Sequence, residues 1–297
     1  MGLALCDRYV SGCAHGKLDA RAASAAAAAD VALVFVSATA GEGRDRSSLN
    51  LSSVAHCHGV AQEELIEAVA AKQPKTAVVM AVPGPVVTTG WRDRVAAILC
   101  AFLPGEQYGH AIADLVFGDV PPQARLPVSM PRTGDDQKMS EHQWPGIPSA
   151  DFPGSKEVVY SEGQIVGYRY YDKHQLAPAF PFGFGLTYGS FSYAKLAVAG
   201  RTVSFTVSRT SGIGCDTPQL YLSYPSAASD PAVPAKVLRY FQKTCAASTD
   251  VSYALTDRDL SSWDVDTKAW VLNRGTFGLT VASASQGGEA LTASLVV

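Results

Sequence analysis

Residues 31–49 read VALVFVSATAGEGRDRSSL, an apolar run that ends in a loop of glycine and charged residues. The β-branched and aromatic residues at 31–36 predict a buried strand. Glu42 lies in the loop that follows, among Gly41, Gly43, Arg44, Asp45 and Arg46. In open α/β sheets, ligand sites lie beyond the carboxyl ends of the strands. The stretch therefore predicts one strand of an α/β sheet with a candidate site loop at its end.

The sequence around this stretch alternates between helix and strand patterns. Residues 18–29 are rich in alanine and favour a helix. Residues 61–72 predict a second helix, because Leu65, Ile66, Val69 and Ala70 recur at the spacing of one helix face. Buried strands are predicted at 76–82 and 95–103, a helix ended by Gly118 at 109–118, and a short proline-interrupted strand at 125–130. This alternation indicates an α/β layer with a mostly parallel sheet.

The second half of the chain has a different pattern. Residues 132–160 are polar and rich in proline and glycine, which is typical of a linker. After residue 190 come short alternating strands with turn residues between them, which predict an antiparallel β-sandwich. We therefore predict an α/β sandwich domain over 1–150, a junction over 151–189 and an all-β domain over 190–297.

Composition narrows the possible functions. The chain has 297 residues, 47% of them hydrophobic, and a net charge of −3. That length allows two domains, and the lack of a basic block argues against nucleic-acid binding. The longest apolar runs are too short to cross a bilayer, so no membrane partner is expected. The first residues reach Asp7 and Arg8 almost at once, so no signal peptide is visible and the localisation stays unknown.

The six cysteines do not form a metal-binding pattern. Cys57 is flanked by His56 and His58 but lacks the partner spacing of a zinc site, so we expect no metal and no cofactor. Cys215 and Cys245 can pair if the protein is exported, and the sequence alone leaves this open.

Two interpretations of Glu42 follow from its surroundings. A carboxylic acid on a strand-end loop can give a proton to a leaving-group oxygen. Alternatively, Glu42, Arg44, Asp45 and Arg46 form a solvated surface network, and spacing alone favours this second interpretation. A dinucleotide site is not supported, because the G-x-G lacks the third glycine and an immediate helix.

Longer motifs carry a resemblance to a known family. The segments in question are ADVALVFVSATAGEGRDRSSLNL, ELIEAVAAKQPKTAVVMAVPGPVV, LPGEQYGHAIADLVFGDVPPQARLPVSMP, YSEGQIVGYRYYD, PFGFGLTYGSFSY, PQLYLSYP, LRYFQKT and LTDRDLSSWDV. In this order they resemble the C-terminal portion of family 3 glycoside hydrolases of the β-glucosidase type. The resemblance implies an α/β sandwich followed by a fibronectin type III-like domain.

The same resemblance assigns roles to residues. Glu42 matches the glutamate that serves as general acid/base in many members. The retaining mechanism also needs a nucleophilic carboxylate about 5–5.5 Å away. In the family this is an aspartate of an N-terminal (β/α)8 barrel of about 250 residues. Asp264 in SSWD falls in the all-β domain instead, so no nucleophile is expected in this chain. We expect an N-terminally truncated α/β domain, a β-glucoside or short oligosaccharide as substrate, and a missing N-terminal barrel as partner.

Several alternatives stay open. Arg44, Asp45 and Arg46 are expected to support Glu42 by orienting it or tuning its pKa, and Asp45 and Arg46 to shape the loop rather than touch substrate. The aromatic residues Tyr168, Tyr170, Tyr171, Phe180, Phe182 and Phe184 are expected to pack between domains rather than stack on sugars. Asn50-Leu51-Ser52 is a glycosylation sequon that matters only after export. The main functional alternative is a non-catalytic carbohydrate-binding or interaction module, with a nucleotide-binding protein a weakly supported third.

Overall fold

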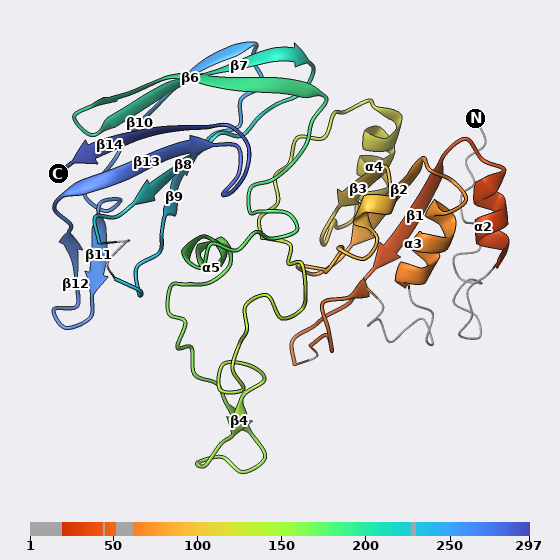
Figure 1. The fold of residues 1–297 in the computed structure, drawn as a ribbon, viewed down its shortest axis with the longest axis horizontal. Helices are drawn as coiled ribbons and strands as arrows, with labels where there is room; N and C mark the ends of the chain where they lie inside the picture. Colours follow the sequence, from red (N-terminus) through yellow and green to blue (C-terminus); the bar gives the residue numbers. More distant parts are fainter. Residues whose placement is uncertain (1–19, 44, 52–61, 227–229) are drawn as a thin grey trace. The chain divides into compact units, whose positions relative to one another are not determined.

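The computed structural model describes residues 20–43, 45–51, 62–226 and 230–297 (Figure 1). The chain divides into two compact units. The first contains residues 1–112 and 130–136, and the second contains residues 113–129 and 137–297. Arg44, the histidine-flanked Cys57 and Ser52 of the sequon lie outside the described residues. Among the described helices none is long and apolar enough to cross a membrane.

The first unit is the predicted α/β layer. Strands β1 (Ala32–Ser37), β2 (Thr76–Ala81) and β3 (Ala97–Cys100) form a parallel sheet in the order β1-β2-β3. Helix α2 (Ala20–Ala27) packs on α3 (Gln62–Ala70), and α3 packs on β1 and β2 (Figure 1). The predicted apolar face of α3 is confirmed, since Ile66, Val69 and Ala70 are buried. A short 3-10 helix, η3 (Arg92–Arg94), leads into β3.

Two strand predictions differ from the structure. The segment 95–103 contains β3, but Ala97 is exposed and the next three residues are half-buried, because β3 is an edge strand of the described sheet. The segment 125–130 is not a strand. Pro127 has no N–H to continue a ladder, and the backbone of Leu126 bonds instead to Gly183 and Phe184. Helix α4 (Tyr108–Phe117) ends as predicted at Gly118, which has a φ of +83°.

The second unit contains the predicted β-sandwich. One sheet has the order β10-β7-β6 and the other β14-β13-β8-β9, and all pairings are antiparallel. The strands are β6 (Gly189–Ala199), β7 (Thr202–Gly212), β8 (Gln219–Ser223), β9 (Val237–Phe241), β10 (Ser248–Ala254), β13 (Thr276–Ala282) and β14 (Ala290–Val296). Two small hairpins add β4 (Ile147–Pro148) with β5 (Lys156–Glu157), and β11 (Ser261–Asp264) with β12 (Ala269–Leu272).

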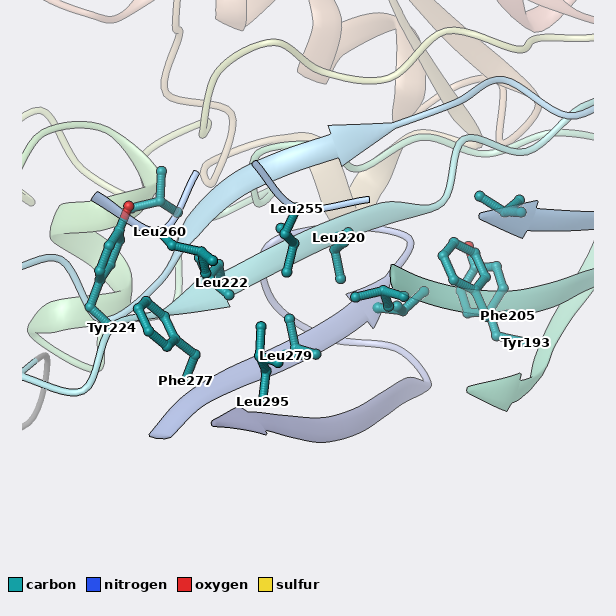
Figure 2. Close-up of a cluster of buried hydrophobic side chains, with 14 of the residues drawn as sticks. Tyr193, Phe205, Leu220, Leu222, Tyr224, Leu255, Leu260, Phe277, Leu279 and Leu295 are labelled. Atoms are coloured by element: carbon teal, nitrogen blue, oxygen red, sulfur yellow. The ribbon is translucent and has the colours of Figure 1, made fainter. Parts of the chain in front are cut away.

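One hydrophobic core lies between the two main sheets. Figure 2 shows Leu220, Leu222 and Leu279 in the middle of this cluster, with Tyr224 and Phe277 at one end. The alternation predicted from the sequence places these side chains inward on each strand, and Leu220, Leu222 and Phe277 have no exposed surface. Burial of these apolar side chains is the main contribution to the stability of such a sandwich.

The junction joins the sandwich through helix α5 (Tyr168–Lys173). The Tyr168 ring stacks on Phe182 at 4.8 Å and meets Tyr221 edge-on at 5.9 Å. Its hydroxyl accepts a hydrogen bond from the N–H of Leu238 at the start of β9. Tyr168 and Phe182 therefore pack within the second unit, and packing of the aromatic residues between domains stays a prediction.

Candidate active site

The candidate loop begins where β1 ends. Ser37 is the last residue of β1, and the backbone N–H of Ala38 still donates to the carbonyl of Ala81, the last residue of β2. Glu42 and Gly43 form a turn, and Gly43 has a φ of +66°, in the left-handed region that favours glycine. Glu42 is exposed at this turn. The local sequence thus places a carboxylate in solvent beyond the carboxyl end of a parallel strand.

Gln62 holds both ends of this loop. Its Oε1 accepts a hydrogen bond from the N–H of Ser37 at 2.9 Å, and its Nε2 donates to the Ser37 carbonyl at 2.8 Å. The same Nε2 donates to the carbonyl of Leu51 at 2.8 Å, and the N–H of Leu51 donates to Glu63 at 3.2 Å. Gln62 is only 3% exposed and Leu51 is fully buried. The first turn of α3 therefore fixes the start and the end of the loop.

Arg46 anchors the middle of the loop to the turn after β2. Its Nη2 donates to the Pro85 carbonyl at 2.9 Å and passes close to Gly84, where a Cβ would lie 3.8 Å from it. Burial lowers the pKa of the Arg46 guanidinium, which still stays charged at neutral pH. The N–H of Val87 also donates to the Leu49 carbonyl, so the two loops share a backbone hydrogen bond.

The predicted site residues are only partly brought together. Glu42 and Asp45 are both exposed, and Arg46 points to the Pro85 carbonyl. Among the described residues, no ion pair joins Glu42 to an arginine or lysine. No group of three or more metal-ligating side chains occurs in the described part of the chain.

Asp264 has a structural role at the end of the β11–β12 hairpin. Its carboxylate accepts hydrogen bonds from the N–H and the hydroxyl of Thr267, at 2.7 and 2.8 Å. These bonds, the backbone one first, hold the pKa of Asp264 below its usual value. The carboxylate therefore closes a surface turn.

Gln62 is the residue that sequence reasoning missed. The helix prediction over 61–72 rested on the apolar positions and assigned no role to Gln62. No local sequence signal singles it out, because only the fold brings the start of α3 to the end of β1. A buried polar side chain must find partners, and here they are backbone groups of the loop.

Comparison with known proteins agrees with this architecture. Residues 14–188 match the glycosyl hydrolase family 3 C-terminal domain, and residues 216–285 match a fibronectin type III-like domain. Among curated relatives, a probable β-glucosidase L of Aspergillus terreus is 35% identical over 302 residues, covering 89% of this chain and 38% of that protein. The β-glucosidase cel3A of Pyricularia oryzae is 32% identical, covering 86% of this chain and 38% of that protein.

Solved structures give the same result. The β-glucosidase DesR of Streptomyces venezuelae, solved with D-glucose, matches with a TM-score of 0.80 at 30% identity, covering 93% of this chain and 35% of that one. A family 3 β-glucosidase of Bifidobacterium adolescentis matches with a TM-score of 0.81 at 30% identity, covering 95% and 42%. The chain thus spans well under half the length of these relatives. The chain belongs to glycoside hydrolase family 3, of which it carries the C-terminal α/β domain and the fibronectin type III-like domain.

Proposed function

We propose that this chain is the acid/base-bearing part of a retaining β-glucosidase-like hydrolase, with Glu42 as the general acid/base. In such a mechanism one carboxylic acid protonates the glycosidic oxygen as it leaves, and later takes a proton from the attacking water. A second carboxylate forms the covalent glycosyl intermediate. We assign that nucleophile to an N-terminal barrel domain, and a β-glucoside to the substrate.

The observation that carries the proposal is the way the loop presents Glu42. Gln62 fixes both ends of the loop, and Gly43 supplies the positive φ of the turn. Catalysis requires the acid to stay within a narrow range of positions relative to the reacting bond. A loop whose two ends are hydrogen-bonded to one buried side chain meets that requirement better than a loop without such a cross-link. Burial by substrate and a second domain would favour the protonated form that an acid needs.

Arg46 has a supporting role in this proposal. Its hydrogen bond to the Pro85 carbonyl supports shaping of the loop rather than contact with substrate. We assign Asp45 the same loop-shaping role because of its position beside Arg46. The supporting role of Arg44 stays a prediction, because Arg44 lies outside the described residues.

The proposal is tested by complementation with a barrel. The purified 297-residue chain is assayed on 4-nitrophenyl β-glucoside, first alone and then with a separately expressed family 3 barrel or fused behind one. We expect activity only when the barrel is present, and its loss in Glu42→Gln. Glu64→Gln, an exposed acid on α3, is the matched control and should keep the activity.

The non-catalytic alternative predicts a different outcome. A carbohydrate-binding module would bind glucosides without turnover in either setting, and Glu42→Gln would then change nothing. Activity of the fusion that persists in Glu42→Gln would also overturn the proposal, because it would place the acid elsewhere.

A further inference from the structure

A pocket lies in the sandwich unit, between α5, β9 and the β11–β12 hairpin. It has a volume of about 200 Å³, below the roughly 300–1,000 Å³ of clefts that take drug-sized ligands. Its lining includes Arg169, Arg239, Arg258, Trp263, Trp270 and Asn273. The pocket is large enough for a single ring with its substituents.

The described lining of this pocket carries positive charge and no negatively charged side chain. Three arginines line it, and no Asp or Glu is among the described lining residues. The carboxylates that adjoin lining residues in the chain have other partners: Asp257 pairs with Arg201, Asp259 accepts hydrogen bonds from Thr256 and Tyr253, and Asp264 accepts them from Thr267. Partly buried positive charge without a counterion is costly. The pocket is therefore suited to an anionic ligand.

Two of the arginines also have unsatisfied donors. The Nε atoms of Arg169 and Arg239 are buried and find no hydrogen-bond partner among the described residues. Arg239 donates a hydrogen bond through Nη2 to the hydroxyl of Tyr224, and this bond orients the Arg239 guanidinium. Guanidinium groups held in this way bind planar carboxylates through paired hydrogen bonds.

The tryptophans supply an apolar surface beside this charge. Trp263 and Trp270 are directly opposed across the hairpin, with ring centroids 5.4 Å apart. They remain 45% and 47% exposed, although large aromatic side chains usually bury most of their surface. The guanidinium of Arg258 lies over the Trp270 ring, so a cationic and an aromatic surface meet at one edge of the pocket.

Polar groups complete the lining at the base of the hairpin. The side chain of Asn273 donates to the Leu260 carbonyl at 3.0 Å and accepts from the hydroxyl of Ser262 at 3.3 Å. These bonds hold the amide in place where it can also meet a ligand hydroxyl. Together, the lining offers cations for a carboxylate, an aromatic face for a ring and polar groups for hydroxyls.

We propose that this pocket binds a uronic acid residue of an acidic polysaccharide. The carboxylate meets the arginines, and one C–H face of the pyranose ring packs on the tryptophans. A neutral glucose would leave the arginines without a counterion, and inorganic phosphate or an acidic peptide would leave the aromatic surface unused. The pocket belongs to the second unit and Glu42 to the first, and this proposal does not depend on the proposed acid/base role.

The test is calorimetric titration of the full chain with tetragalacturonate. Its methyl ester, which has the same rings without the charge, and tetraglutamate, which has the charge without the rings, are titrated in parallel. We expect tetragalacturonate to bind at least tenfold more tightly than either. The affinity should fall at least tenfold in Arg258→Gln and in Trp263→Ala, and less in Arg258→Lys. Lys243→Gln, an exposed cation outside the pocket, should leave it unchanged.

Thermal unfolding of each variant is measured as well, so that a loss of binding can be distinguished from a loss of folding. If Trp263→Ala unfolds the hairpin, Arg258→Gln still tests the carboxylate contact, because Arg258 is exposed. Equal binding of the acid and its ester, equal binding of tetraglutamate, or no binding to the folded chain at millimolar ligand would each overturn the proposal. An equal loss in Lys243→Gln would reduce the effect to general charge attraction and overturn it as well.

Discussion

Gln62 and Ser37, 25 positions apart in the chain, exchange two hydrogen bonds of 2.9 and 2.8 Å between a side-chain amide and a backbone unit. The Gln62 amide acts at the end of β1 as a neighbouring strand would, pairing with both the N–H and the C=O of Ser37. It then bonds to Leu51 at the other end of the loop. One buried side chain therefore holds both ends of the loop that carries Glu42.

Gln62→Met should loosen this loop. Methionine has a similar volume but offers no donor, so the carbonyls of Ser37 and Leu51 lose their partner. Each buried group left unsatisfied costs about 1–3 kcal/mol. We expect a lower midpoint in urea unfolding and faster amide hydrogen exchange at Ser37 than in the native chain. Gln107→Met, an exposed glutamine before α4, is the control, and equal effects from both variants would contradict the role of Gln62.

Removal of the disulfide between Cys215 and Cys245 should destabilise the sandwich. The bond joins residues 30 positions apart, and closure of a loop of that length contributes about 3–4 kcal/mol in the chain-entropy account. The paired Cys215→Ser and Cys245→Ser variant should lose that amount in urea unfolding. Reduction of the native chain should have the same effect, and an unchanged midpoint would contradict it.

The structure settles a pairing that the sequence left open. A disulfide of this kind is typical of proteins in oxidising compartments. We therefore expect the native chain to lack free thiols at Cys215 and Cys245 after expression with export, as peptide mapping without reductant would show.

Arg125 and Asp216 form a buried ion pair within the second unit. Asp216 also accepts hydrogen bonds from the hydroxyl of Tyr193 and from the N–H of Thr217. Burial, followed by the hydrogen bond and the charge of Asp216, raises the pKa of Tyr193, so its hydroxyl stays a donor. Arg125 further donates to the Gly185 carbonyl, which ties segment 113–129 to the junction.

Asp216→Ala should therefore cost more than a surface charge deletion. It leaves Arg125 buried without a counterion, a change worth about 3–5 kcal/mol. Adding Arg125→Met should recover part of this loss, because the uncompensated charge is then removed. A double-mutant cycle in urea measures the coupling, and strictly additive losses would contradict it.

Asp172 should make stability depend on pH. Burial raises its pKa above 3.8, and the nearby Lys236 and the hydrogen bond from Gln286 only partly offset this. The native state therefore holds the Asp172 proton more tightly than the unfolded chain does. The associated stability is present below the unfolded pKa and is lost as pH rises through the higher folded pKa.

Asp172→Asn should remove this dependence. The difference in unfolding free energy, variant minus native, should become more favourable to the variant as pH rises from about 3 to 7. Urea unfolding at several pH values measures the difference. A difference that is flat with pH, or that moves in the opposite direction, would contradict the raised pKa of Asp172.

The sequence predicted the elements with strong periodicity. The apolar runs of β1 and β2 predicted buried strands, and the sequence alternation of β7 and β13 matches their alternating burial. In β8 the alternation did not predict exposure, because residues 219–222 are all buried. The strand predicted at 125–130 was wrong because tertiary hydrogen bonds of Leu126 to Gly183 and Phe184 replaced a ladder that Pro127 could not continue.

The candidate site was predictable in part. Glu42 stands out because glycines flank it at the end of an apolar strand. Gln62 does not stand out, because a glutamine at a helix start is ordinarily solvated and only the fold brings it beneath the loop. The pocket beside Trp263 and Trp270 was also missed. Its lining comes from the junction, β9 and a hairpin, and no local pattern links these segments.

The most direct test of the central claim uses the leaving group. With the full chain fused behind a family 3 barrel, kcat/KM of native and Glu42→Gln enzymes is compared on 4-methoxyphenyl and 2,4-dinitrophenyl β-glucosides. A general acid contributes about 10²–10⁴-fold to a leaving group that needs a proton, and little to one that does not. We predict a loss in that range for the methoxyphenyl substrate and below tenfold for the dinitrophenyl substrate. Equal losses on both substrates, or no loss on either, would contradict the assignment of Glu42 as the general acid.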